Sequence, residues 1–147
     1  MLVGAMLVGA CGSEPAPEAA PVRAQPAVPS AIGRWEPTQD GHCLELRDDG
    51  TFELTDRTGD HPDTVITGRY VLEGDALRIT PERIHQQRWV SRCRKHVYPE
   101  RDVESHPVLG VGLRTGETTT FTLTLALESL TMCGPAGHCE TLRRRPR

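Results

Sequence analysis

Apolar and polar residues alternate with a period of two along much of this sequence, and this pattern restricts its fold more than any other feature. The clearest case is residues 119–127, where Phe121, Leu123, Leu125 and Leu127 alternate with threonine and alanine. Residues two apart lie on the same face of a β-strand, so this segment predicts a strand with one buried face. We expect all four large apolar side chains to point into a core.

The same alternation flanks short turn signals elsewhere in the chain. Residues 43–47 and 51–55 flank Asp48, Asp49 and Gly50, which is typical of a β-hairpin whose aspartates serve the turn. No stretch shows a helical period of 3.6 residues over three turns, and residues 81–89 are only the least unfavourable helix candidate, because proline suits a first helical position. Further strands are predicted at residues 64–72, 77–80, 129–132 and 140–144. Closely spaced strands predict an all-β antiparallel meander that closes into a small barrel, which leaves few open edges.

Length and charge exclude several classes of protein. A chain of 147 residues suggests one folded domain. The net charge of −3 gives no general reason to expect a nucleic-acid partner, and we predict none. No apolar run approaches the roughly 20 residues that cross a bilayer as a helix.

The first eleven residues are uncharged, small and apolar, and they end at a cysteine. We predict a signal peptide at residues 1–10, since the stretch is too short for a membrane anchor. Residues 8–11, Val-Gly-Ala-Cys, resemble the cleavage box of bacterial lipoproteins. The resemblance implies that Cys11 is the mature N-terminus and carries acyl chains such as palmitate, several of which anchor a protein firmly. The alternative is an apolar N-terminal strand or helix with a free Cys11.

Residues 11–30 form the predicted linker between this anchor and the folded domain, residues 31–147, which ends in a basic tail. The linker is rich in proline and alanine, which favours an extended tether over a packed structure. Gly12 stands where lipoproteins retained in the inner membrane carry an acidic residue. The resemblance therefore implies a cell-envelope location at the outer membrane.

A second resemblance covers residues 32–80 and, less closely, residues 119–144. It rests on Gly33-Arg34-Trp35, Leu44-x-Leu46, Asp49-Gly50-Thr51-Phe52, Gly68-x-Tyr70 and Gly74-Asp75-x-Leu77. These motifs resemble a small lipocalin-like domain of bacterial envelope lipoproteins. The resemblance implies that Trp35, placed by Gly33, closes one end of the barrel, and that Arg143 or Arg144 packs across it through a cation–π contact. The sequence leaves open whether the barrel is hollow or filled.

Four cysteines remain in the predicted domain: Cys43, Cys93, Cys133 and Cys139. An even number in an exported domain favours two disulfides, with three pairings possible. Cys133 and Cys139 bracket a turn-rich loop that brings them together easily, which would pair Cys43 with Cys93. The alternative is a Zn²⁺ or copper site, because histidines stand beside these thiols. Its candidate ligands are His42, Cys43, Cys93, His96, His138 and Cys139.

Charge is unevenly distributed along the predicted domain. Residues 36–60 are mostly acidic, whereas residues 83–101 and the tail are mostly basic. We expect these charges to pair with one another or to face solvent, because surface pairs are common and weak. The alternative is a basic patch for anionic envelope polymers, lipid headgroups or an acidic partner.

No catalytic motif stands out. Ser91, His96 and Asp102 could be written as a triad, but three such residue types fall close together readily by chance. We predict a protein that is not an enzyme, uses no cofactor, and binds an unknown envelope ligand or protein while anchored in the membrane through acylated Cys11. Two alternatives are an envelope metal-binding protein using the Cys/His set, and an inhibitor or interaction protein acting through the loop from Cys133 to Cys139.

Overall fold

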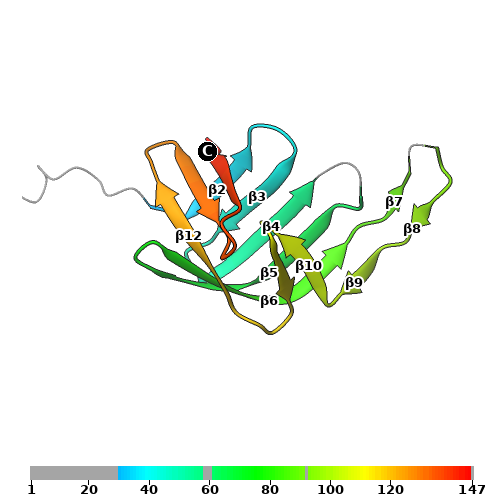
Figure 1. Ribbon diagram of the computed structural model, residues 1–147, viewed down its shortest axis with the longest axis horizontal. Coiled ribbons are helices and arrows are strands. Elements are labelled where there is room, and N and C mark those ends of the chain that lie inside the picture. Colours follow the sequence, from blue (N-terminus) through cyan, green and yellow to red (C-terminus); the bar gives the residue numbers. More distant parts are fainter. Residues whose placement is uncertain (1–29, 58–60, 92, 147) are drawn as a thin grey trace, which may run out of the picture.

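The computed structural model describes residues 30–57, 61–91 and 93–146 (Figure 1). These residues form strands and turns and contain no helix, so the predicted all-β class is confirmed. The signal peptide at residues 1–10, the lipidation site Cys11 and the linker before Ser30 lie outside the described residues. The sequence-based expectations for them therefore stay predictions.

Thirteen strands are present in the described residues. In chain order they are β2 (Gly33–Pro37), β3 (Gly41–Leu46), β4 (Thr51–Arg57), β5 (Thr64–Glu73), β6 (Ala76–Gln86), β7 (Trp89–Val90), β8 (Val97–Tyr98), β9 (Arg101–Val103), β10 (Ser105–Val108), β11 (Val111–Arg114), β12 (Thr119–Leu125), β13 (Ser129–Cys133) and β14 (Cys139–Arg144).

Eight of these strands form a closed antiparallel barrel in the order β2-β3-β4-β5-β6-β12-β13-β14, with β14 returning to β2. The closing contact joins β12 to the first part of β6, where Phe121 pairs with Leu77. The last part of β6 pairs instead with the short strand β9. The predicted barrel is therefore confirmed, and residues 87–118 form a long excursion between its fifth and sixth strands.

The predicted turn at residues 48–50 joins β3 to β4. The Oδ1 atom of Asp49 accepts hydrogen bonds from the backbone N–H of Thr51 at 3.0 Å and from its hydroxyl at 2.6 Å. Gly50 has a φ of 87°, a conformation that favours glycine. The turn residues therefore serve the hairpin, as the sequence predicts.

The weak helix candidate at residues 81–89 is not a helix, because these residues continue β6 as far as Gln86 and then begin β7. Pro81 pairs with Gly68 at a register irregularity between β5 and β6. Proline lacks a backbone N–H, and a bulge tolerates that loss within a sheet. A Cβ atom on Gly68 would lie 2.2 Å from the carbonyl oxygen of Thr80, so glycine allows the strands to approach here.

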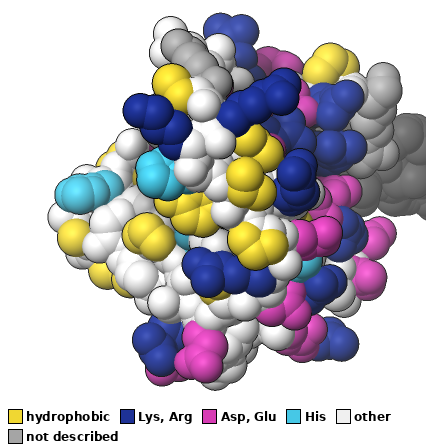
Figure 2. Space-filling model, turned by 90° about the vertical axis from the view of Figure 1, so that its right-hand side faces the viewer, with side chains coloured by type: hydrophobic (Ala, Val, Ile, Leu, Met, Phe, Trp, Pro, Cys, Tyr) yellow, Lys and Arg dark blue, Asp and Glu magenta, His cyan; other side chains and the backbone are white. Residues whose placement is uncertain are grey.

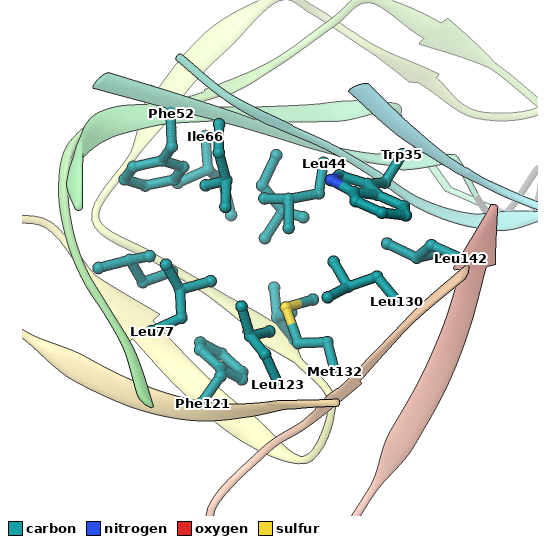
Figure 3. Close-up of a cluster of buried hydrophobic side chains, with 14 of the residues drawn as sticks. Trp35, Leu44, Phe52, Ile66, Leu77, Phe121, Leu123, Leu130, Met132 and Leu142 are labelled. Carbon is teal, nitrogen blue, oxygen red and sulfur yellow. The ribbon is translucent and has the colours of Figure 1, made fainter. Parts of the chain in front are cut away.

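Alternate residues of the barrel strands point inward and fill the interior (Figure 3). Trp35, Phe52 and Phe121 are the largest of these buried side chains. The strand predicted at residues 119–127 ends at Leu125, and the chain then turns into β13. The expectation that Leu127 is buried is consequently wrong, since its side chain is 77% exposed.

Trp35 and Arg144 close one end of the barrel. The Arg144 guanidinium lies over the indole ring of Trp35, 4.3 Å from the ring centre, and it is the arginine of the two candidates that makes this contact. A Cβ atom on Gly33 would lie 3.0 Å from Arg144 Nη1, so glycine leaves room for the guanidinium. Trp35 Nε1 donates to the carbonyl of Ala31 at 2.8 Å, and Arg144 Nη2 donates to that of Ser30 at 2.6 Å. These bonds fix the first described residues across this end.

The β10–β11 hairpin, here named the cap, covers the other end of the barrel. Its side chains Val108 and Leu113 are fully buried and belong to the same core as the barrel residues. The cap also meets the β13–β14 loop, where a Cβ atom on Gly134 would lie 2.4 Å from the carbonyl oxygen of Leu109. The barrel is thus filled by its own side chains and closed at both ends.

This packing predicts very different costs for the same substitution at two leucines. Leu142 is fully buried on β14, so Leu142→Ala is expected to lower the free energy of unfolding by about 2–5 kcal/mol. Leu127→Ala removes the same atoms from an exposed turn and is expected to change it by less than about 0.5 kcal/mol. Urea unfolding followed by circular dichroism measures both. Equal losses for the two variants would contradict the assigned core.

Candidate functional site

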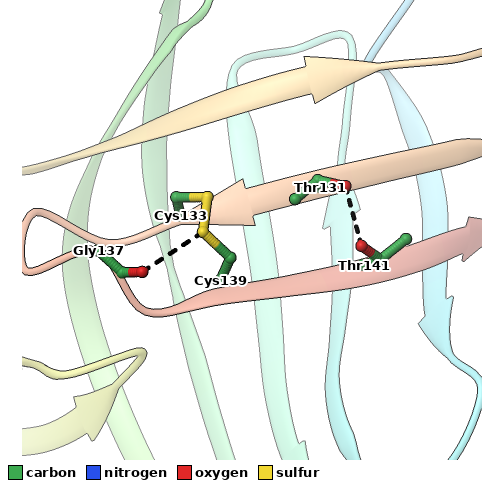
Figure 4. The surroundings of a disulfide bond; sticks show 5 residues. All are labelled: Thr131, Cys133, Gly137, Cys139 and Thr141. Carbon is green, nitrogen blue, oxygen red and sulfur yellow. Dashed lines mark hydrogen bonds between the residues drawn. A yellow bond between two sulfur atoms is a disulfide. The ribbon is translucent and has the colours of Figure 1, made fainter.

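The disulfide predicted between Cys133 and Cys139 is present (Figure 4). The two cysteines are register partners on β13 and β14, so the bridge closes the loop between these strands. Further along the same pair of strands, the hydroxyls of Thr131 and Thr141 form a hydrogen bond of 2.9 Å. The bridge and this bond hold β14 against β13.

The second predicted disulfide is wrong, because Cys43 and Cys93 are both free. Cys43 lies in the barrel wall on β3, whereas Cys93 is exposed in the excursion between β7 and β8. Burial raises the pKa of the Cys43 thiol, although Arg57 nearby opposes this change. Cys43 is therefore a poor nucleophile near neutral pH.

The alternative metal site is not assembled. Cys139 is consumed by the disulfide, and His96 lies beside Cys93 in the excursion rather than beside His42 and Cys43 in the barrel. His138 packs against the cap, where its ring would contact a Cβ atom on Gly110. Among the described residues, no group of three or more His, Cys, Asp or Glu side chains is placed to hold a metal ion.

The single bridge makes a testable contribution to stability. In the chain-entropy description, closing so short a loop contributes about 2 kcal/mol. Cys133→Ser with Cys139→Ser is expected to lower the free energy of unfolding by that amount, measured by urea denaturation. Cys43→Ser with Cys93→Ser is the matched control and should leave it within about 1 kcal/mol. A larger loss in the control than in the bridge variant would contradict the assignment.

A cluster of ionisable side chains lies beneath the cap. His42 on β3, Asp56 on β4 and Glu140 on β14 occupy inward positions, in phase with the apolar residues of the same strands. His106 on β10 joins them from the cap. All four side chains are mostly buried, with exposed fractions between 10% and 19%. This arrangement is named the polar cluster below.

Short contacts connect the polar cluster. His42 Nδ1 lies 2.6 Å from Glu140 Oε1, and the backbone N–H of His42 donates to Glu140 Oε2 at 3.0 Å. His106 Nε2 lies 2.6 Å from Asp56 Oδ2, which is itself 3.7 Å from His42 Nε2. Two buried atoms within this part of the chain, His42 Nε2 and Asp56 Oδ1, lack a hydrogen-bond partner. The His106–Asp56 contact joins the cap to the barrel.

The polar cluster favours charged side chains despite its burial. Burial by itself lowers the pKa of His42, but the hydrogen bond that it donates to Glu140 and the negative charges of Glu140 and Asp56 outweigh it and leave the pKa raised. Burial likewise acts to raise the pKa of Asp56, yet His106, His42 and His61 leave it lowered. The charged forms of His42 and Asp56 are therefore favoured despite their burial.

Sequence reasoning considered His42 only as a metal ligand and missed the other three residues of the polar cluster. A signal was available in the strand period. Each of the three barrel residues lies two positions from a buried leucine on its own strand and therefore shares its face: His42 with Leu44, Asp56 with Leu54, and Glu140 with Leu142. Polar residues in phase with a buried face predict an inward-facing polar group. The contact of His42 with Glu140, 98 residues away, depends on how the barrel strands come together.

The β7–β8 hairpin projects from the barrel as a separate two-stranded sheet (Figure 1). This feature, residues 88–98, is named the arm; residue 92 within it lies outside the described residues. Trp89 pairs with Tyr98, and their ring centres are 5.5 Å apart. Figure 2 views the molecule from the arm's side and shows hydrophobic and basic side chains gathered next to one another.

The residues of the conceivable triad are not assembled for catalysis. Asp102 lies on β9, where Arg83 Nε donates to it at 3.0 Å and His85 Nδ1 lies at 2.7 Å. The backbone N–H of His96 donates to Ser91 Oγ at 3.0 Å, and the backbone N–H of Ser91 donates to the carbonyl oxygen of His96 at 2.9 Å, so neither bond involves the imidazole. The imidazole of His96 instead lies near the Tyr98 ring.

Comparison with known proteins found no match: no protein-family model, no curated protein and no solved structure matches this chain. Within the described ranges, no helix has the length and apolar character that crossing a bilayer requires.

The polar cluster predicts a pH-dependent stability. The raised pKa of His42 adds stability that is complete below about 6.5 and is lost as the pH rises through the folded-state pKa. The lowered pKa of Asp56 adds stability above about 3.9 that is lost on further acidification. The contribution of the cluster is therefore largest between these two limits.

His42→Gln is expected to lower the free energy of unfolding by about 2 kcal/mol near pH 6 and by less near pH 8.5, since hydrogen bonds to charged groups are the stronger ones. Urea unfolding at both pH values measures the difference. His85 also has a raised pKa, caused by Asp102 and Glu100, and it lies outside the polar cluster, so His85→Gln serves as the control for a histidine paired elsewhere on the sheet. A pH-independent loss in His42→Gln would contradict the charged cluster.

Proposed function

We propose that this chain is a non-catalytic, lipid-anchored protein of the cell envelope, in which a filled barrel of lipocalin-like form carries an external binding surface. The observation that carries the proposal is the closure of the barrel. Its interior holds tightly buried side chains such as Phe52 and Phe121, and both ends are covered. A filled barrel of this size supports a scaffold rather than a container for a ligand.

The external surface best suited to binding is the arm. It stands outside the barrel and presents apolar and basic side chains to solvent, including Val97 at 56% and Tyr98 at 43% exposure. Exposed apolar groups beside charges are typical of interaction sites. The arm therefore supports a binding role that needs no reaction and no cofactor.

The proposed anchor rests on the sequence of residues 1–11. The outer membrane remains the proposed location on the strength of Gly12.

A second candidate binding surface is the disulfide-bridged loop. Residues 135–139 are exposed, and the bridge holds their ends together. Preorganisation of this kind favours an inhibitor or interaction loop, since less entropy is lost on binding. One side of the loop, at Gly134, is buried against the cap, which leaves a smaller free surface than that of the arm.

The anchor is tested by Cys11→Ser in the cell that makes the protein. The variant is expected to lose a metabolically incorporated palmitate analogue completely and to leave the membrane fraction after a wash with high salt. Cys93→Ser, which removes an exposed thiol instead, is the matched control and should keep both. Membrane association of Cys11→Ser that survives the salt wash would contradict the anchor.

A further inference from the structure

The arm carries positive charge without a counterpart. Residues 88–99 contain no aspartate or glutamate. Within the described residues, the side chains of Arg88, Arg94 and Lys95 make no ion pair and no side-chain hydrogen bond. Outside the arm, six described arginines lie within 4.0 Å of a carboxylate, whereas the other described arginines form no ion pair; the six are Arg47, Arg69, Arg78, Arg83, Arg114 and Arg145.

The arm also presents apolar and aromatic groups beside these charges. Trp89 and Tyr98 form a tilted ring pair across the two strands. Val97 is 56% exposed, and together with Val90, Arg88 and Arg94 it lines a shallow groove. Figure 2 shows basic side chains flanking hydrophobic ones on this side of the molecule. The surface is therefore amphipathic over a few residues.

Two physical effects act together on such a surface at a membrane. Tryptophan and tyrosine favour the boundary between headgroups and acyl chains, because their rings are apolar and their N–H or O–H groups are polar. Lysine and arginine are attracted to anionic headgroups within about one Debye length. A soluble acidic partner would satisfy the charges but would not by itself account for exposed Val97 beside the aromatic pair.

We propose that the arm is a docking site for the headgroup layer of an anionic lipid bilayer. Arg88, Arg94 and Lys95 contact lipid phosphates, and the Trp89–Tyr98 pair lies at the level of the headgroups. This proposal deepens the proposed function and rests on it for the protein's place at the envelope. It does not depend on the acyl anchor, because the arm's own side chains make the contact.

The test uses the full chain with Cys11→Ser, which removes the acylation site. Phosphatidylglycerol-containing vesicles are expected to bind this protein at low salt and to release it as salt is raised. Vesicles of phosphatidylcholine alone should bind it far more weakly. The net charge of −3 makes attraction of the whole chain to an anionic surface unfavourable, so binding points to a local patch.

The tryptophans report where the protein touches the vesicle. The chain has two, and Trp35 is fully buried in the barrel. A shift of tryptophan emission to shorter wavelength on adding phosphatidylglycerol vesicles is therefore expected from Trp89. Emission that stays unchanged while the protein binds would place the contact elsewhere and overturn the proposal.

A charge-matched pair of triple variants locates the binding surface. Replacing Arg88, Arg94 and Lys95 with glutamine is expected to weaken vesicle binding about 100-fold, because each cation near an anionic surface contributes roughly a fivefold factor. Replacing the ion-paired Arg69, Arg78 and Arg114 with glutamine changes the net charge equally and should weaken binding less than about fivefold. Circular dichroism confirms that each variant folds.

Three outcomes would overturn the proposal. The arm variant could bind vesicles as tightly as the parent, or the control variant could lose as much affinity as the arm variant. The parent could also bind soluble polyglutamate while ignoring phosphatidylglycerol vesicles, which would identify an acidic protein partner instead. None of these results bears on acylation of Cys11, which the palmitate readout tests separately.

Discussion

Pairing between β6 and β12 joins strands separated by more than thirty residues and turns an open sheet into a barrel. The contact uses only the first part of β6, where Ala76, Leu77 and Ile79 face partners on β12. The remainder of β6 has a free edge that β9 covers in part. Because β6 pairs with β12 over only part of its length, the residues between these two strands leave the barrel wall. The cap and the arm both belong to this segment.

The local pattern predicted the barrel strands because each carries its own alternation and its own turn. The β3–β4 hairpin needs only Asp49 and Gly50 to reverse the chain, and both lie within the segment itself. The weak helix candidate at residues 81–89 has a different origin. Pro81 suits a helix start when only its neighbours are considered, whereas its actual place depends on Gly68 in the adjacent strand. A bulge is a property of two strands, and one strand alone does not show it.

The candidate sites also differ in whether their residues are close in sequence or come from distant segments. Cys133 and Cys139 are close in sequence, so their bridge followed from the short loop between them. Trp35 and Arg144 were connected by resemblance to a known barrel rather than by any local pattern. The His106–Asp56 contact was not predictable in either way, since the cap reaches Asp56 only after the excursion has folded back over the barrel.

Ionisable groups at the junction of cap and barrel have a different effect from the apolar core. Apolar contacts such as those of Val108 and Leu113 hold the cap down without specifying an orientation, because the hydrophobic effect is non-directional. The His106–Asp56 bond has a defined geometry, and a displaced cap would leave the partly buried Asp56 carboxylate without it. Loss of a hydrogen bond to a buried charge destabilises the folded state. The polar cluster therefore restricts how the cap sits, while the core supplies the stability.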